Sequence, residues 1–462
     1  MLPSLIRPYR LSLLLALGLP AMVGCAKDRT GSDNVVIITW DAVNPRMFWG
    51  GDEGWNTIPE VEALFAESAV FPHTATTRGL TGPALASMLT GAYPRDHKVR
   101  LCNTVPDMVG LPELFDEHGF RTLGFSANQC QLMDVGIDER VCTSAREYEA
   151  ISRRQRDADL ETALLDELER LGSRERMFLW LHLAEPHTPF EVVDGWYDVF
   201  HPDEYQGSLV AANSDMLYDI VLDGGPYSDE DRRHLEAVYA SQIRETDGRV
   251  GRVLDKLRDL GRYDDAVVVL GFDHGEELYE HNDYFFHGCS PYNSVINVVY
   301  SFRAPGVTDQ GSTHEGWVST VDVAPTVVEL AGAFEWEGQP VGRSLADTMG
   351  TGQEQDVPVY FERGTETAGV IWRDHKYIIS GDTSFQDCQP FETLGGSYNT
   401  EPTELYDLRS DPDELDNLSG LGESQEADLH QQLCDWVLDS TWVSETTDHG
   451  NPLVTACLDG GR

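Results

Sequence analysis

Long apolar runs followed by polar side chains recur through the first 300 positions of the chain. The clearest runs are residues 35–40, 177–183, 266–272 and 295–300. Nearly unbroken apolar runs of this length are typical of strands that are buried on both faces of a parallel sheet. Segments with helical periodicity, such as 160–168, lie between them. This alternation predicts an α/β fold, with a doubly wound, mostly parallel sheet flanked by helices.

Capping residues in the sequence mark the start of two predicted helices. Ser228 followed by Asp231 is a capping-box pattern, and it predicts a long helix that ends near Gly261. Asp322 is expected to cap a shorter helix that carries Pro325 in its first turn.

The pattern changes after about residue 355, where short apolar segments replace the long runs. They predict short strands, then an acidic turn region and a final helix near 429–438. We therefore expect a main domain at 34–354 and a smaller α+β subdomain at 355–462. The loops expected to form a substrate pocket are 44–56, 200–227 and 280–290.

The first 25 residues have the pattern of an export signal. Two arginines precede an apolar stretch at 11–23 that is too short to span a bilayer comfortably. The stretch leads to Cys25, as in bacterial lipoprotein signals, in which this cysteine is lipidated. We expect residues 1–25 to be a lipoprotein signal peptide and residues 26–33 to be a tether. The protein would then lie in the bacterial cell envelope and touch the membrane only through its lipid anchor; an ordinary secretory signal and a secreted protein are the alternative.

The charge balance excludes some classes of partner. Lys and Arg number 33 against 79 Asp and Glu, which gives a formal net charge of −46. Nucleic-acid binding requires a basic surface, so we expect no nucleic-acid partner. The same balance argues against electrostatic docking on anionic lipid. An anionic substrate would need a locally positive site, most simply a metal ion.

Seven cysteines follow Cys25, and export to an oxidising compartment predicts disulfides among them. The nearest pairs are Cys130 with Cys142 and Cys434 with Cys457, although spacing alone does not fix the connectivity. The odd count leaves one thiol over, and none of the seven has metal-type spacing.

The run 81–91, Thr-Gly-Pro-Ala-Leu-Ala-Ser-Met-Leu-Thr-Gly, places a hydroxyl at the start of a predicted helix. Pro83 is tolerated in the first turn, and Gly91 is a natural stop. Free N–H groups and the positive end of the helix dipole suit an oxyanion such as phosphate or sulfate. An ordinary surface turn followed by a helix is the alternative.

Polar residues follow three of the predicted strands, at the sheet edge where ligands bind in open α/β folds. They are Asp41, the region 182–187, and Asp273 with His274. With Thr81, the residues Asp41, Asp273 and His274 offer two carboxylates, a hydroxyl and an imidazole. This donor set suits one divalent ion, such as Mn, Zn, Ca or Mg. Taken singly, strand-end carboxylates are more often helix caps than ligands, and a histidine in an apolar strand, such as His182, is more often an ordinary buried histidine.

These residues stand in motifs that resemble the sulfatase family of the alkaline-phosphatase superfamily, over nearly the whole mature chain. The family signature Cys/Ser-x-Pro-x-Arg-x-x-x-x-Thr-Gly has the spacing of 81–91, with Pro83, Thr90 and Gly91 retained. Further matches, in chain order, are a strand ending at Asp41; His182, Pro186, His187, Pro189 and Phe190; Asp273-His274-Gly275-Glu276-Glu277; 321–326; and 404–408 with Asp411-Pro412. The resemblance implies an alkaline-phosphatase-like fold, a catalytic domain at 34–354, and metal-dependent hydrolysis of sulfuric or phosphoric esters.

The chain departs from the family pattern at the nucleophile. Thr81 stands where sulfatases oxidise Cys or Ser to formylglycine, and its extra methyl prevents that aldehyde. Leu85 replaces the motif arginine, and Ala42 stands where sulfatases often have a second Asp. His274 matches the family variant with histidine in place of asparagine. This set is similar to the phosphoesterases and phosphoglycerol-type transferases of the superfamily, so phosphoesters are favoured over sulfate esters.

The resemblance also implies roles. The metal would be held by Asp41, Thr81, Asp273 and His274, and Thr81 would be the metal-activated nucleophile. His187 and His287 would bind ester oxygens or protonate the leaving group, although His287 can also be an ordinary loop residue. His97 is expected to support the site, and Glu185, His187 and His287 are a weaker candidate for a second metal site.

The expected substrate is a small-molecule, lipid or glycan ester. Two other functions stay open. One is an envelope transferase that moves a phospho-group to an acceptor alcohol. The other is an inactive homologue that binds an anionic glycan, which the loss of the motif arginine would favour.

Overall fold

The computed structural model describes residues 31–102, 104–143, 152–201, 205–207, 209, 228–281, 285–288, 290–306, 308–332, 336, 340–364, 366–381, 401–439 and 452–458. The expected signal peptide, most of the tether and most of the 200–227 loop lie outside these residues. Among the described helices, none combines the length and the apolar character that crossing a membrane requires.

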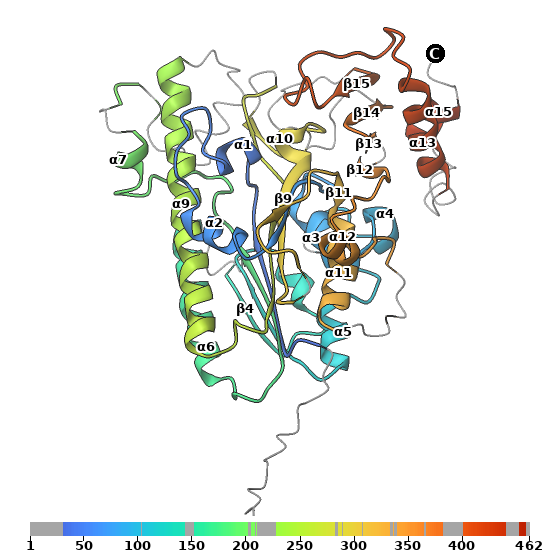
Figure 1. Ribbon diagram of the computed structural model, residues 1–462. Coiled ribbons are helices and arrows are strands. Elements are labelled where there is room, and N and C mark those ends of the chain that lie inside the picture. The colour runs from blue at the N-terminus through green and yellow to red at the C-terminus, as the bar shows by residue number, and fades with distance from the viewer. Residues whose placement is uncertain are drawn as a thin grey trace, which may run out of the picture. The chain divides into compact units, whose positions relative to one another are not determined.

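Nine strands of the described chain form one large sheet (Figure 1), in the order β10-β2-β9-β6-β1-β5-β3-β4 with β11 beside β2. The strands are β1 (Asn34–Trp40), β2 (Ala69–Ala75), β3 (Arg121–Ser126), β4 (Glu139–Cys142), β5 (Met177–Leu183), β6 (Val267–Phe272), β9 (Asn297–Arg303), β10 (Ser312–Thr313) and β11 (Val318–Ser319). β1 runs parallel to both β5 and β6, which confirms the mostly parallel sheet. β9 is antiparallel to β2 and β6, and it begins later than predicted because residues 293–296 form the short helix α10 (Asn293–Ile296).

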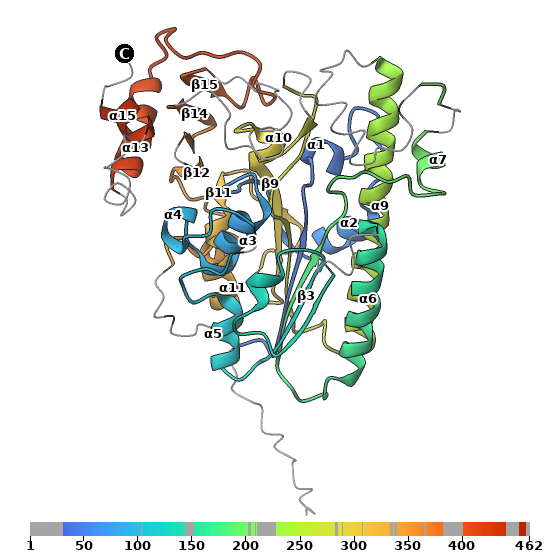
Figure 2. The same cartoon turned by 180° about the vertical axis from the view of Figure 1, so that it is seen from behind.

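Helices cover both faces of the large sheet. The helices are α1 (Pro45–Phe48), α2 (Pro59–Phe65), α3 (Thr81–Thr90), α4 (Pro94–His97), α5 (Leu111–Glu117), α6 (Arg153–Arg170), α7 (Tyr197–Phe200), α9 (Asp229–Asp259), α11 (Val323–Leu330) and α12 (Ala346–Thr351). Figures 1 and 2 show α6 and α9 on one face and α3, α5 and α11 on the other. Because both faces are covered, every residue of β1 and of β5 is buried, as their apolar sequences predict.

The two predicted helix starts have different outcomes. Ser228 and Asp231 form the expected capping box, and α9 ends just before Gly261, whose φ is +64°. Asp322 does not cap α11. Its carboxylate instead accepts the N–H groups of Ser319 (2.9 Å) and Arg343 (2.7 Å), because a 3-10 turn capped by Ser319 precedes the helix.

A separate antiparallel sheet lies in the C-terminal region. It contains β12 (Val359–Arg363), β13 (Thr367–Trp372), β14 (His375–Ser380) and β15 (Thr403–Asp407), in that order. Helices α13 (Glu426–Leu438) and α15 (Pro452–Leu458) pack against it. A buried ion pair, Arg95 Nη2 to Glu362 Oε2 at 2.9 Å, joins α4 to β12.

Both expected cysteine pairs, Cys130 with Cys142 and Cys434 with Cys457, are disulfides. Cys102 is a free, half-buried thiol. Cys289 and Cys388 lie outside the described residues.

Candidate active site

The register of β1 with its neighbours brings the strand-end residues together. Trp40 pairs with Phe272 of β6 on one side and with Leu183 of β5 on the other. The residues that follow, Asp41 and Asp273, therefore leave adjacent parallel strands at the same edge, where the binding site of an open α/β sheet is expected. The N–H of Asp273 donates to the carbonyl of Trp40 at 3.2 Å, which keeps the two strand ends in register.

Asp41, Asp273 and His274 form a buried cluster in which one ligand atom of each lies within 4.8 Å of the others. His274 Nε2 lies 3.6 Å from Asp41 Oδ1 and 3.5 Å from Asp273 Oδ2. On the other side of the ring, His274 Nδ1 lies 2.8 Å from the carbonyl oxygen of Gly275. A neutral imidazole that donates its Nδ1–H there presents the lone pair of Nε2 to the two carboxylates.

The electrostatics of this cluster fit a divalent cation. Burial raises the pKa of Asp41 well above its ordinary value, and the nearby Asp273 raises it further. Burial also raises the pKa of Asp273 to about 7, and its Oδ2 is buried without a hydrogen-bond partner. Burial lowers the pKa of His274 to about 4, so its imidazole is neutral at pH 7. The two carboxylates and the imidazole lone pair supply donors of the kind that such an ion requires. The ion would in turn supply the positive charge that the two carboxylates lack.

Thr81, the first residue of α3, directs its hydroxyl into the cluster. Its Oγ1 lies 3.2 Å from His274 Nε2 and 3.4 Å from Asp41 Oδ1. The first turn of α3 offers fewer free N–H groups than we expected. Pro83 has none, and the N–H of Gly82 faces the Cys102 thiol. The hydroxyl, rather than a row of helix N–H groups, is thus what α3 contributes to the site.

His187 and His287 lie beside the cluster. Their ring centres are 4.7 Å apart, and the centre of the His287 ring is 4.4 Å from that of His274. His287 Nδ1 lies 3.0 Å from Glu276 Oε1. Burial lowers the pKa of both His187 and His287, and the charge of Arg153 lowers both further, that of His287 to about 3. The structure therefore brings all six predicted residues (Asp41, Thr81, His187, Asp273, His274 and His287) to one place, with their imidazoles neutral at pH 7.

Sequence reasoning missed Asn128, Arg153 and Glu276 as members of the site. The Asn128 amide donates to Asp41 Oδ2, and Asn128 lies just past the end of β3, so the strand-end rule that selected Asp41 could have found it. Glu276 is buried against His287, within a motif that was recognised but given no role. Arg153 begins α6, and nothing in the local sequence marks it.

His182 and His97 lie next to residues of the site and contact the elements that carry them. His182 Nδ1 lies 2.9 Å from Thr39 Oγ1, and its Nε2 is 3.9 Å from Asp41 Oδ2, so His182 is a buried neighbour of a candidate ligand. His97 Nε2 lies 3.0 Å from Ser87 Oγ of α3, which places His97 under the helix that carries Thr81.

The geometry does not support a second metal site at Glu185. Its Oε1 accepts from Gln242 at 3.4 Å, and its Oε2 lies 4.0 Å from Arg249 Nε. Its carboxyl group therefore faces α9 instead of His187 and His287. Among the described residues, Asp41, Asp273 and His274 are the group with metal-ligand geometry.

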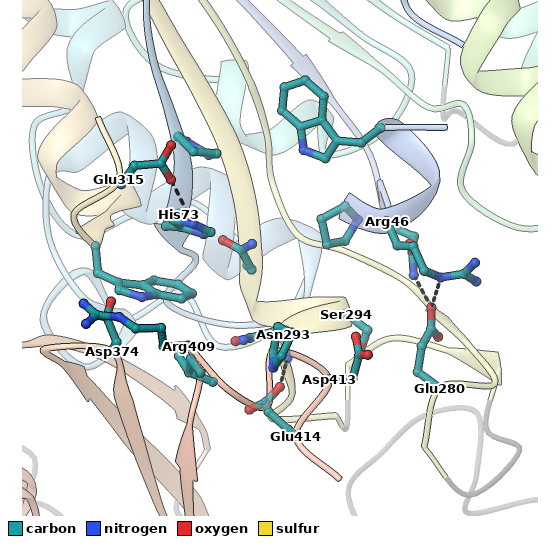
Figure 3. Close-up of a pocket in the computed structure, with 18 of the residues that line it drawn as sticks. Arg46, His73, Glu280, Asn293, Ser294, Glu315, Asp374, Arg409, Asp413 and Glu414 are labelled. Atoms are coloured by element: carbon teal, nitrogen blue, oxygen red, sulfur yellow. Dashed lines mark hydrogen bonds and ion pairs between the residues drawn. The ribbon is translucent and has the colours of Figure 1, made fainter. Parts of the chain in front are cut away.

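A pocket of about 530 Å³ opens elsewhere, between α1, β2, α10 and the C-terminal region at 374 and 408–414. Figure 3 shows His73 paired with Glu315 and Arg46 paired with Glu280 in its walls. Parts of two loops that we expected to form the substrate pocket, 44–49 and 280–281, line it. None of the six predicted site residues lines it, so this pocket is distinct from the candidate active site.

The doubly wound sheet and the donor cluster at the ends of β1 and β6 define an ester hydrolase of the alkaline-phosphatase superfamily. The chain belongs to the sulfatase family, because the Sulfatase family model matches residues 33–333. Enzymes of this family bind a divalent metal ion.

Similar proteins include both sulfatases and phosphonate hydrolases. The choline-sulfatase of Rhizobium meliloti (strain 1021) is 24% identical over 444 residues, which cover 84% of this chain and 83% of the relative. A solved structure in complex with its substrate D-glucosamine-2-N,6-O-disulfate has a TM-score of 0.68 at 17% identity, and the match covers 91% of this chain and 99% of that one. The phosphonate monoester hydrolase of Silicibacter pomeroyi has a TM-score of 0.66 at 18% identity, over 90% of this chain and 96% of that one.

Proposed function

We propose that the protein is a metal-dependent hydrolase of phosphoesters with Thr81 as its nucleophile. The observation that carries the proposal is the position of Thr81 Oγ1, 3.2 Å from His274 Nε2 and 3.4 Å from Asp41 Oδ1. A hydroxyl between an imidazole and a carboxylate, both candidate metal ligands, is placed where a metal-activated nucleophile has to lie.

The chain's own residues hold and orient the reacting groups. Asp41, Asp273 and His274 would hold the ion, while Asn128 fixes Asp41 and the Gly275 carbonyl fixes the His274 ring. When bound, the ion lowers the pKa of the attacking hydroxyl and polarises a phosphoryl oxygen.

The reaction would proceed in two displacements. The bond from Thr81 Oγ1 to phosphorus forms as the bond from phosphorus to the leaving oxygen breaks. His287, in contact with Glu276, is placed to give that oxygen a proton. Water then cleaves the phosphothreonine ester, which restores the hydroxyl and releases phosphate or a phosphomonoester.

The preference for phosphoesters rests on two residues. A threonine at position 81 cannot form the aldehyde that sulfatases use, whereas its hydroxyl can act directly as a nucleophile. Ala42 leaves the site without a carboxylate at the position that follows Asp41, and its N–H instead donates to Asp273 Oδ1 at 3.1 Å. The resemblance of the fold to a phosphonate monoester hydrolase is consistent with this preference.

The test is a panel of aryl substrates assayed with Mn, Zn, Ca and Mg in turn. The panel contains a sulfate ester, a phosphate monoester, a phosphate diester and a phosphonate ester. We expect hydrolysis of a phosphoester, a loss on the order of 10³-fold or more in Thr81→Ala, and partial activity in Thr81→Ser. Thr90→Ser in the same helix is the control, because its hydroxyl only bonds the carbonyl of Ala86 (2.7 Å).

Two results would refute the proposal. One is full activity in Thr81→Ala, and the other is a faster reaction with the sulfate ester than with every phosphoester. Higher turnover with an added acceptor alcohol than in water would identify a transferase instead. Metal analysis is expected to find about one divalent ion per chain, lost in Asp273→Ala.

We also propose that the protein is exported and lipid-anchored through Cys25. The two disulfides support an oxidising compartment. The test is cell fractionation of the wild type and Cys25→Ser. The wild type is expected in the membrane fraction and the variant in the soluble fraction; an unchanged distribution would refute the anchor.

A further inference from the structure

Arg153 begins α6, and its charge acts on Asp41, His187 and His287 of the candidate active site. Its Nε is buried without a hydrogen bond, and within the described part of the chain no carboxylate lies within ion-pair distance of it. Arg153 is half-buried, and an Nε–H that is buried without an acceptor is costly, so such a group often marks a missing ligand.

The position of Arg153 is fixed by Asp157, one helical turn later. Asp157 accepts the N–H groups of Ala184 (2.9 Å) and Glu185 (3.0 Å), directly after β5 and just before His187. Residues four apart lie on the same face of a helix, so Arg153 faces this strand end too. Its charge accordingly acts on Asp41 and Glu276.

Arg249 and Arg176 also have a buried Nε without a hydrogen bond, but their Nη1 atoms have partners. Arg249 donates to Glu161 at 2.9 Å, and Arg95 donates to Glu362 and to the carbonyl of Trp436. Arg78 also has a buried Nε without a partner, but the nearest opposite charges acting on it are Glu362 and Glu366, away from the cluster. Among the described arginines, Arg153 is thus the one that faces the site without an ion-pair partner.

We propose that Arg153 binds a non-bridging oxygen of the substrate's phosphoryl or sulfuryl group. This inference rests on the proposed function for the identity of the reaction. The carboxylates of the cluster repel an anion and the neutral imidazoles do not attract one, so an oxyanion needs a fixed cation besides the metal ion. A guanidinium donates in a planar fork that matches such oxygens, and the bound oxyanion would be the partner that Arg153 lacks.

The test compares Arg153→Ala, Arg153→Lys and the control Arg170→Ala. Arg170 is on the same helix, is 69% exposed, and pairs with Glu167. The readouts are kcat/KM for the best phosphoester, the inhibition constant of inorganic phosphate, metal content and thermal stability. We expect Arg153→Ala to lower kcat/KM by roughly 10- to 100-fold and to weaken phosphate inhibition at least about tenfold. Metal content is expected to stay unchanged, the lysine variant to recover part of the loss, and added guanidinium ion to restore activity to the alanine variant.

The outcomes separate this inference from the proposed function. Unchanged kcat/KM and phosphate inhibition in Arg153→Ala, alongside an inactive Thr81→Ala, would overturn the role of Arg153 alone. A loss that guanidinium does not restore and that accompanies metal loss or a lower Tm would overturn it as well. If no ester is hydrolysed, the role of Arg153 is tested by measuring the binding of inorganic phosphate by calorimetry. Equal affinity in the wild type and Arg153→Ala refutes the inference, and affinity weakened at least about tenfold in the variant supports it.

Discussion

Glu276 Oε1 lies 3.0 Å from Nδ1 of His287, and both side chains are buried next to His274. Burial raises the pKa of Glu276 well above its ordinary value and lowers that of His287 to about 3, so the pair holds its proton on the carboxyl group. A carboxylic acid in contact with an imidazole is a proton source for a leaving oxygen.

Glu276→Gln is therefore expected to slow esters with poor leaving groups most. Glutamine keeps a hydrogen bond to His287 but supplies no proton. The kcat/KM for alkyl esters should therefore fall roughly 10²-fold, and that for nitrophenyl esters much less. The measurement is kcat/KM against leaving-group pKa for the wild type and the variant. Equal losses across the series would contradict a role in proton donation.

Gly275→Ala is expected to disturb His274, the candidate metal ligand next to it. A Cβ at this position would lie 1.9 Å from the carbonyl oxygen of Ser294, so the backbone has to move. The Gly275 carbonyl fixes the His274 ring, and loss of such support commonly costs about 10- to 100-fold in metal affinity. Metal titration checks this, with Gly350→Ala as control because a Cβ there meets no atom within 4 Å. Unchanged metal affinity would show that the backbone shift does not reach His274.

Glu185 is expected to make stability depend on pH. Burial raises its pKa to about 8, and the nearby Asp157 adds to the rise, whereas the unfolded chain has a pKa of about 4.3. Between these values the folded protein keeps a proton that the unfolded chain has lost. Stability from this group is thus fully present below the unfolded pKa and falls as pH rises toward about 8.

Glu185→Gln removes this dependence because glutamine does not ionise. The free energy of unfolding is measured at pH 6 and at pH 8. Between these pH values, that of the wild type should fall by about 1–3 kcal/mol more than that of the variant. Glu245→Gln, which removes a partly exposed partner of Arg249, is the control. The same difference between wild type and Glu185→Gln at both pH values would contradict the prediction.

Arg95→Ala is expected to destabilise the protein by about 3–5 kcal/mol, because it leaves the buried Glu362 carboxylate uncompensated. Arg95 also stacks on Trp436, with its Cζ 3.2 Å from the ring centre. Arg170→Ala, which breaks an exposed pair, should cost no more than about 1 kcal/mol. Chemical denaturation measures both, and similar costs would show that the buried pair contributes little.

Much of the site could be predicted because strand ends mark it. Asp41 and Asp273 follow long apolar runs, and parallel strands bring their carboxyl ends together, so the hydrophobic pattern alone predicted that these two candidate ligands lie side by side. Thr81 followed from the spacing of its motif. The direction of β9 could not be predicted, because an antiparallel strand buried on both faces has the same apolar sequence as a parallel one.

Arg153 and the partners of Glu185 escaped prediction for a different reason. Arg153 reaches the site because Asp157 binds the backbone at 184–185, a contact between segments that no local pattern encodes. Glu185 lies two residues from His187, yet its carboxyl group points toward α9, and only packing decides such a direction. Residue types and spacing define what a site can contain, whereas side-chain direction depends on the assembled fold.

The attachment of Glu362 has a consequence for biosynthesis. Its N–H donates to the carbonyl of Thr77 at 2.9 Å and its side chain binds Arg95, so one residue of β12 holds the chain on both sides of the helix that carries Thr81. The ribosome makes all four candidate metal ligands well before it makes Glu362. A nascent or truncated chain that stops before β12 thus contains all four candidate ligands but lacks the two Glu362 contacts that flank α3. We therefore expect hydrolytic activity to be gained late in synthesis, after the C-terminal sheet has folded.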